Sequence, residues 1–187
     1  MKTIAILSIA GLAAAASAQG LSVAFMADRS TANAGDTIHW TVSVSTTGYG
    51  STAYFGGFVG NLLSSDNSLG TSGNYTSHMA GNATTPSGNG ADVMGINIFN
   101  SALLGTDDSS NPYVCFEFDV VAGAGTGDLT YGAAGTWSEF ANDGIFTLPD
   151  EYTQPGMTSD RVQINVPTPG AIALLGLGGL TAARRRR

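Results

Sequence analysis

The chain has 187 residues, a single cysteine and a formal net charge of −7 at pH 7. All 14 acidic residues lie between Asp28 and Asp160, and the body between the two chain ends holds only Arg29 and Arg161 as cations, which gives it a formal charge of −12. So acidic a body argues against binding to nucleic acids, whose affinity depends on Lys and Arg releasing counterions, and against binding to anionic membranes.

The first 18 residues have the layout of a secretory signal peptide. Lys2 is the positive residue near the start, Ile4–Ala16 is almost wholly apolar, and Ala16 and Ala18 form an A-x-A cleavage site before Gln19. A buried first helix is the alternative, but such a helix would need apolar partners on every side. We therefore expect export of the protein, with a signal helix at 1–18 and a mature chain that starts near Gln19.

The clearest strand signal within residues 19–165 is Thr37–Ser45, where apolar and polar residues alternate. Alternation of this kind predicts a strand with one face in a core and the other in water. The turn Asn33–Asp36 precedes the strand, and its Gly35 suits a positive φ. The apolar face consists of Ile38, Trp40, Val42 and Val44.

Similar patterns predict further strands along the chain. Leu21–Met26 and Val93–Phe99 are two of them. A third strand has a predicted core face and a predicted solvent face, made respectively of Val114, Phe116, Phe118 and Val120, and of Cys115, Glu117 and Asp119. The last strand signal is the alternation of Val162, Ile164 and Val166. Weaker strand candidates are Ala53–Val59, Asp128–Tyr131, Thr136–Phe140 and Ile145–Leu148.

No stretch of the body shows apolar residues at a sustained helical spacing, and glycine is frequent, with 26 in the chain. Eight or nine short strands between turn clusters predict an all-β, antiparallel β-sandwich that forms one domain, 19–165. We expect the polar stretch Ser64–Gly90 to be a long loop, either functional or mobile.

Two segments resemble strands of cohesin-like and related carbohydrate-binding domains. The first is Ala34–Val44, with the sequence AGDTIHWTVSV, and the second is Phe116–Tyr131, with the sequence FEFDVVAGAGTGDLTY. The resemblance implies a jelly-roll β-sandwich with an adhesive or scaffolding role.

Paired carboxylates are the first candidates for catalysis. Two pairs are adjacent in sequence, Asp107 with Asp108 and Asp150 with Glu151, and a third, Glu117 with Asp119, shares one strand face. Glycoside hydrolysis needs two carboxyl groups about 5–9.5 Å apart across a cleft. The third pair stands on the predicted solvent face, so we do not expect an enzyme.

The thiol and the histidines favour the same interpretation. Cys115 lies in a predicted strand, and its spacing to His39 or His78 indicates no nucleophile–base pair. We interpret both histidines as surface or loop residues, because two histidines so far apart do not define a zinc site.

Binding sites are predicted more readily than catalytic ones. Ca²⁺ takes roughly six to eight oxygen ligands, and a calcium site would use Asp107, Asp108, Asn111 and Asp143. The alternative is that these residues cap turns through bonds to the backbone. Aromatic rings could stack on sugars, and the candidates are Tyr49, Tyr54, Tyr75, Trp137 and Tyr152.

The C-terminal segment 166–187 has three parts. It begins with Val166, Pro167, Thr168, Pro169 and Gly170, and the prolines favour an extended backbone. The uncharged stretch Ala171–Ala183, of 13 residues, is shorter than the roughly 20 that span a bilayer. A cationic end follows, made of Arg184, Arg185, Arg186 and Arg187. An apolar segment before such a cluster is typical of a chain end held on the cytoplasmic side of a membrane.

This tail resembles the PEP-CTERM sorting segment of bacterial surface proteins, with Thr168 in place of the glutamate of the Pro-Glu-Pro motif. The resemblance implies a C-terminal sorting helix, recognition by an exosortase-like membrane transpeptidase and transient or permanent membrane contact. Together with the segment 1–18 it predicts an exported cell-envelope or extracellular-matrix protein, in contact with extracellular polysaccharide and with a non-catalytic β-domain. The alternatives are a carbohydrate- or calcium-binding adhesive module and, less favoured, a secreted hydrolase.

Overall fold

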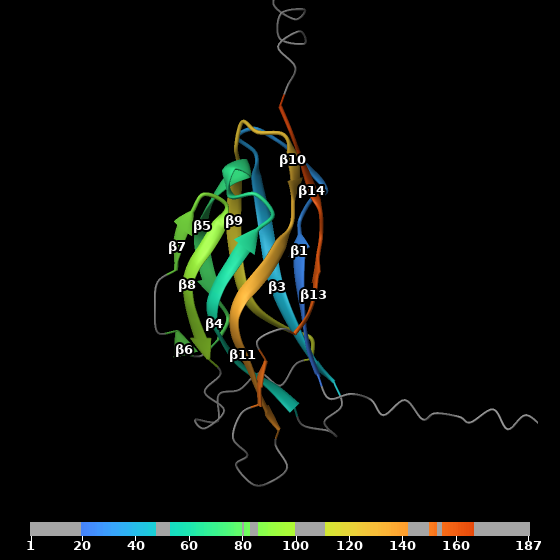
Figure 1. The fold of residues 1–187 in the computed structure, drawn as a ribbon, viewed down its shortest axis with the longest axis vertical. Helices are drawn as coiled ribbons and strands as arrows, with labels where there is room; N and C mark the ends of the chain where they lie inside the picture. Colours follow the sequence, from blue (N-terminus) through green and yellow to red (C-terminus); the bar gives the residue numbers. More distant parts are fainter. Residues whose placement is uncertain are drawn as a thin grey trace, which may run out of the picture.

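The alternation of apolar and polar residues places the long strands in two sheets that face each other across one core. The computed structural model describes residues 20–47, 53–79, 81–82, 86–99, 111–141, 150–152 and 155–166. In Figure 1 the two sheets lie one over the other, and the remaining residues are drawn in grey. The predicted signal helix, the sorting helix and the strand Ile145–Leu148 lie outside the described residues.

The first sheet has five strands in the order β13-β1-β3-β9-β5. Its pairs are antiparallel, apart from the parallel pair of β1 and β13. The predicted strands at Leu21–Met26 and Thr37–Ser45 lie inside two of its members. The bounds are β13 (Gly156–Ser159), β1 (Gly20–Ala27), β3 (Thr37–Thr47), β9 (Tyr113–Ala122) and β5 (Gly70–Ser77).

The second sheet has the order β12-β11-β4-β8-β6, and the short strand β7 also pairs with β8. A third, three-stranded sheet has the order β10-β14-β2, with β14 and β2 parallel. The bounds of the second sheet are β12 (Asp150–Tyr152), β11 (Tyr131–Ala141), β4 (Ala53–Ser64), β8 (Asp92–Phe99), β6 (Gly81–Asn82) and β7 (Ser87–Asn89). Those of the third are β10 (Gly127–Leu129), β14 (Val162–Asn165) and β2 (Thr31–Asn33).

Aromatic rings from both large sheets fill the core. In the first sheet Trp40 of β3 stacks on Phe118 of β9, with ring centroids 6.4 Å apart. Tyr131 at the start of β11 meets both rings edge-on, at 4.8 and 5.0 Å. In the second sheet Phe58 of β4 stacks on Trp137 of β11 at 4.0 Å. Such pairs contribute about 0.5–1.5 kcal/mol each beyond the burial of their area.

The predicted core face of β3 is confirmed, since Ile38, Trp40, Val42 and Val44 are at most 1% exposed. The expected faces of β9 hold only from Phe116 onward. The register of β3 and β9 shifts between Val42 and Ser43, so Cys115 is fully buried while Val114 is 37% exposed. A β-bulge adds one residue to one strand and moves every residue before it to the opposite face. Our prediction that Val114 faces the core and Cys115 faces solvent was therefore wrong.

Our prediction of a long loop at Ser64–Gly90 was also wrong. Its polar residues form the edge strand β5, the short strands β6 and β7 and a 3₁₀ helix, η1 (Asn67–Leu69). Asp66 caps this helix by accepting a 2.9 Å hydrogen bond from the backbone N–H of Ser68. An edge strand with few apolar residues has no alternation to reveal it in the sequence. Within the described residues, no helix is both long and apolar enough to cross a bilayer.

Candidate functional site

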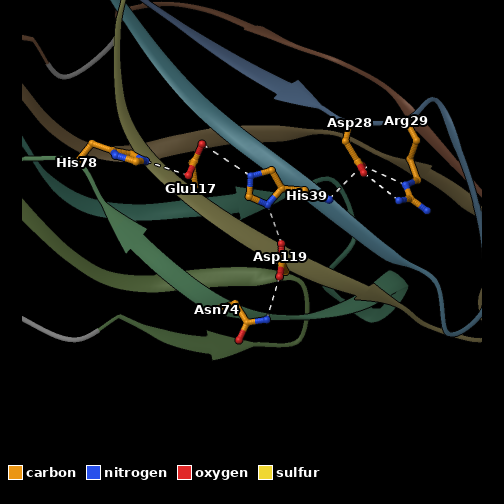
Figure 2. Close-up of polar contacts among 7 residues, drawn as sticks. All are labelled: Asp28, Arg29, His39, Asn74, His78, Glu117 and Asp119. Atoms are coloured by element: carbon orange, nitrogen blue, oxygen red, sulfur yellow. Dashed lines mark hydrogen bonds and ion pairs between the residues drawn. The ribbon is translucent and has the colours of Figure 1, made fainter.

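Five polar side chains meet on the outer face of the five-stranded sheet. We call His39, Glu117, Asp119, Asn74 and His78 the polar cluster (Figure 2). They come from three neighbouring strands, since His39 lies in β3, both carboxylates lie in β9, Asn74 lies in β5, and His78 follows the end of β5. Their outward direction follows from alternation, because the apolar residues on either side of them in β3 and β9 point into the core.

Glu117 lies between the two histidines, and Asp119 lies between His39 and Asn74 (Figure 2). Asp119 Oδ1 lies 2.8 Å from His39 Nδ1, and Asp119 Oδ2 accepts a 2.9 Å hydrogen bond from the amide of Asn74. Glu117 Oε2 lies 2.9 Å from His78 Nε2, and Glu117 Oε1 lies 3.8 Å from His39 Nε2. Each carboxylate of β9 therefore has one oxygen directed to β3 and one directed to the chain of β5.

These contacts shift the pKa of three members of the cluster. The hydrogen bond to Asp119, with the negative charges of Asp119 and Glu117, raises the pKa of His39. The hydrogen bond to His78 lowers the pKa of Glu117, and those to Asn74 and His39 lower the pKa of Asp119. Each direction has the same cause, since opposite charges and hydrogen bonds favour the ionised form.

The polar cluster does not have the properties of a catalytic carboxylate pair. A glycosidase needs one carboxyl group with a raised pKa as its general acid, whereas the pKa of both Glu117 and Asp119 is lowered. The histidine side chains are 45% and 41% exposed on the open face of the sheet. Over the described part of the chain, no three His, Cys, Asp or Glu side chains are arranged to hold a metal ion.

The sequence placed Glu117 and Asp119 on one solvent face of a strand, and the structure confirms it. It did not connect either histidine with them, because His39 and Asp119 are 80 residues apart and come together only through the ladder of β3 and β9. The sequence signal that was available is a polar residue between two core residues on each predicted strand. This signal predicts that the polar side chain lies on the outer face of the sheet, but it does not predict which strands are neighbours.

The second sheet has a different outer face. A hollow of about 320 Å³ lies there over β4, β8 and β11, and its lining residues are uncharged: Gly57, Phe58, Val59, Asn97, Ile98, Phe99, Thr136 and Ser138. Val59 is 55% exposed and Phe99 is 45% exposed at this hollow. Exposed apolar side chains that surround a hollow are typical of a binding surface.

The strand register places the lining residues of the hollow next to one another. Val59 lies opposite Thr136 on one side and Asn97 on the other, and Gly57 lies opposite Ser138 and Phe99. A Cβ atom at Gly57 would lie 2.6 Å from the carbonyl oxygen of Ile98, closer than packing allows. Glycine at this position is therefore required by the close approach of the β8 backbone.

Other residues that we predicted to form sites instead pack in the core or bond the backbone. Trp137, a candidate for sugar stacking, is fully buried in the core, which corrects that prediction. The ring of Tyr75 is half-buried and stacks on Phe116 with centroids 6.4 Å apart. The side chain of Asn111 bonds the backbone of Thr46, accepting from its N–H at 3.1 Å and donating to its carbonyl at 2.8 Å.

The rest of the predicted sites lie outside the described residues or side chains. This holds for the calcium candidates Asp107, Asp108 and Asp143, the aromatic candidates Tyr49, Tyr54 and Tyr152, and the carboxylates Asp150 and Glu151. It also holds for the cleavage site at Ala16, Ala18 and Gln19 and for the tail from Pro167 to Arg187. Val166 precedes that tail directly after β14 and is 38% exposed, so it does not continue the buried face of Val162 and Ile164.

No protein-family model and no curated protein matches the sequence. Solved structures of cohesins share the fold. The seventh ScaB type I cohesin of Pseudobacteroides cellulosolvens is 15% identical with a TM-score of 0.53, over 80% of this chain and 95% of that one. An OlpA cohesin of Clostridium thermocellum, solved in a cohesin–dockerin complex, is 12% identical with a TM-score of 0.52, over 77% and 99%.

A third similar structure is the cohesin module of a family 33 glycoside hydrolase from Clostridium perfringens. It is 10% identical with a TM-score of 0.53, over 80% of this chain and 99% of that one. The chain therefore has a cohesin-like β-sandwich fold, and the expected sandwich is confirmed at this level. The parallel pairs β1–β13 and β14–β2 are the departure from the purely antiparallel arrangement that we predicted.

Proposed function

We propose that this protein is a secreted, surface-sorted module that binds a protein partner and has no catalytic role of its own. The observation that carries the proposal is the uncharged hollow on the outer face of β4, β8 and β11, on a sandwich whose opposite face bears the polar cluster. The protein surface there offers Val59 and Phe99 to a partner without any charge to desolvate. Apolar contacts at the centre of an interface contribute most of its affinity.

The fold supports a protein partner. An OlpA cohesin with the same fold was solved in complex with a dockerin. The low identity restricts the comparison to the fold, so the partner of this chain is inferred only as a class: a protein that inserts an apolar side chain beside Phe99.

Substitutions on the two outer faces test this binding role. We expect Val59→Asp and Phe99→Asp each to reduce the capture of partner proteins at least tenfold, because a charge in the hollow must be desolvated on binding. Val121→Asp is the matched control, since Val121 is 47% exposed on β9 in the other sheet. Quantitative mass spectrometry measures the proteins that each variant captures from the envelope fraction of the expressing cells. Loss of binding by the control alone would contradict the proposal.

Sorting by an exosortase-like transpeptidase is the second part of the proposal. It is supported by the order of Pro167 and Pro169, the apolar stretch Ala171–Ala183 and the final arginines, together with the signal-like segment 1–18. Fractionation of cells that express the chain with and without residues 167–187 tests it, with mass spectrometry of both mature termini. We expect the shortened chain in the medium and the full chain in the envelope. Freely soluble exported protein that still ends at Arg187 contradicts processing.

A calcium-binding adhesive module is the alternative function. It depends on Asp107, Asp108 and Asp143, since the Asn111 amide already bonds the backbone of Thr46. Calcium binding predicts a higher melting temperature in millimolar Ca²⁺ than in chelator, and Asp108→Asn would remove the difference. Identical melting curves would exclude this alternative. Polysaccharide binding has one fewer of the stacking residues that we expected, because Trp137 is buried in the core.

A further inference from the structure

We propose that the open edge of β11 receives an extended segment of a partner protein, which pairs with Gly132–Thr136 as an additional strand. The main chain of this segment bonds β11, and its outward side chains lie beside the hollow. The inference deepens the proposed function and rests on it for the role of the hollow, whereas the strand pairing stands on separate observations.

Only one side of β11 is paired along its whole length. On that side β4 pairs with it without a shift in register from Tyr131 to Ser138. On the other side the short strand β12 pairs with β11 at Trp137, Ser138 and Glu139. Among the described residues, no strand pairs with this second side between Tyr131 and Trp137. The second sheet therefore has an open edge next to β12.

The hydrogen bonds of β11 show which main-chain groups face this edge. The N–H of Tyr131 donates a 2.9 Å hydrogen bond to Ser159 Oγ and not to β4. In an antiparallel strand the main-chain groups of successive residues alternate between its two sides. Those of Ala133, Gly135 and Trp137 therefore face the same way as Tyr131, and Trp137 pairs there with β12. Ala133 and Gly135 each present one N–H and one C=O to the open edge.

The side chains along this edge do not obstruct a further strand. The segment Gly132–Gly135 has the sequence Gly-Ala-Ala-Gly, and no charged residue and no proline occurs from Tyr131 to Ser138. Ala134 is exposed, and no atom lies within 4 Å of a Cβ added at Gly132. Natural sheets protect an exposed edge with charges, prolines or bulges. The edge of β11 has none of these over this segment, so the main chain of a partner can approach it.

The open edge is continuous with the hollow. Thr136 lines the hollow and lies directly opposite Val59. A strand added at about 4.8 Å from β11 directs every second side chain to the same outer face. A large apolar side chain beside Thr136 therefore extends over it toward Val59. In strand addition of this kind, main-chain hydrogen bonds supply affinity, and pockets for alternate side chains supply specificity.

Charge restricts the partner segment further. The body of this chain has a formal charge of −12, and Arg29 and Arg161 are paired with Asp28 and Asp128. An acidic segment would be repelled, whereas a neutral or basic one would not. The partner segment is thus extended, free of carboxylates, and carries a large apolar residue at a position that faces outward.

Hydrogen exchange of the full chain, read for single amides by NMR, tests the edge itself. We expect the amides of Ala133 and Gly135 to exchange at least about tenfold faster than those of Ala134 and Thr136, which face β4. Equal protection of the two sets would show that this edge is covered, and it would overturn the proposal.

Selection of random linear peptides displayed on phage, with the full chain as the target, tests the strand addition. Ala133→Pro should weaken the selected peptides at least about tenfold, because the ring replaces the N–H that faces the edge. Proline is tolerated on an edge strand when its nitrogen faces solvent, and thermal unfolding checks that the variant folds. Ala133→Ser is the matched control, because it keeps the N–H, and it should bind as the wild type does.

Synthetic peptides of the selected sequences give a test that needs no variant of the protein. Methylation of every second amide nitrogen should abolish binding in one of the two possible frames and leave it unchanged in the other, because only one set of amides faces β11. Equal effects in both frames would overturn the proposal, as would a selection that yields no peptide.

Val59→Asp separates this proposal from the proposed function. Peptides that respond to Val59→Asp but not to Ala133→Pro would leave binding at the hollow intact and overturn strand addition. Peptides that respond to Ala133→Pro but not to Val59→Asp would support strand addition and contradict the role of the hollow. We expect a response to both.

Discussion

At the scale of single residues, the glycines of β4 and β11 are as informative as the aromatic residues. Gly60 and Gly135 lie opposite each other in the ladder, and the ring of Phe58 lies near both positions where a Cβ would stand. Added Cβ atoms would come within 2.4 Å of the Ala134 oxygen and 2.3 Å of the Val59 oxygen, respectively. The absence of two side chains thus leaves room for the stack of Phe58 on Trp137.

Alanine at Gly60 should therefore destabilise the protein. We expect Gly60→Ala to lower the free energy of unfolding by about 1–3 kcal/mol, because the new methyl group meets backbone atoms that cannot rotate away. Gly132→Ala in the same ladder is the control, since no atom lies within 4 Å of its added Cβ. Urea unfolding of both variants measures the difference. Equal stability of the two variants would show that the strands are farther apart than described.

Cys115 is a second informative residue, because the bulge buries it completely. Burial raises the pKa of the thiol, and its Sγ lies 3.4 Å from the carbonyl oxygen of Val42. Since the thiolate is the reactive form, we expect no reaction with an aromatic disulfide reagent at pH 8 in the folded protein and full reaction in denaturant. Absorbance of the released thiol measures both rates. Rapid labelling of the folded chain would place Cys115 on the solvent face.

At the scale of elements, β4 shows how one strand serves two surfaces. Phe58 and Leu62 point into the core, at 2% and 1% exposure, whereas Val59 and Leu63 point outward, at 55% and 40%. The core side fixes the register of the sheet, and the outer side supplies the apolar surface beside Phe99. Alternation with a period of two makes both roles possible in one run of residues.

This division predicts opposite results for neighbouring positions. Val59→Asp should change the free energy of unfolding by less than about 0.5 kcal/mol, because its side chain is in water. Phe58→Ala should cost about 3–5 kcal/mol through the cavity that it leaves. Thermal and urea unfolding compare the two variants. A large loss in Val59→Asp would mean that this face is covered in the protein alone.

At the scale of the whole molecule, the hollow on the second sheet differs in charge from the polar cluster on the first. The hollow over β4, β8 and β11 is lined by uncharged residues. The carboxylates of the polar cluster lie on the outer face of the other sheet (Figure 2). Both arginines of the body are paired, Arg29 with Asp28 and Arg161 with Asp128. A net negative body favours repulsion between copies, whereas the lining of the hollow adds no charge of its own to this repulsion.

The same charge distribution predicts how overall stability depends on pH. Above about pH 6.5 stability should fall by a few tenths of a kcal/mol, because His39 loses its proton and the negative body repels itself more strongly. Urea unfolding between pH 5 and 8.5 measures this fall, and added salt should reduce the repulsive part. His39→Gln should remove only its own share. A rise in stability up to pH 8.5 would contradict the assigned pKa direction of His39.

The β-class, the core face of β3 and the shared solvent face of Glu117 and Asp119 were predictable from the sequence, because alternation is a local property of the chain. The export and sorting signals at 1–18 and 166–187 are likewise local, and they remain predictions. The edge strand β5, the burial of Cys115 and the burial of Trp137 were not predictable, since each depends on a neighbouring strand that the sequence does not name.

The sequence by itself therefore determined which side of each regular strand faces the core and how acidic the surface is. Only the tertiary structure decided that His39 and His78 stand on either side of Glu117, and that Gly57, Val59 and Phe99 line one hollow. The physical reason is the same in both cases. A strand dictates the direction of its own side chains, but the order and register of strands arise from packing between segments far apart in the chain.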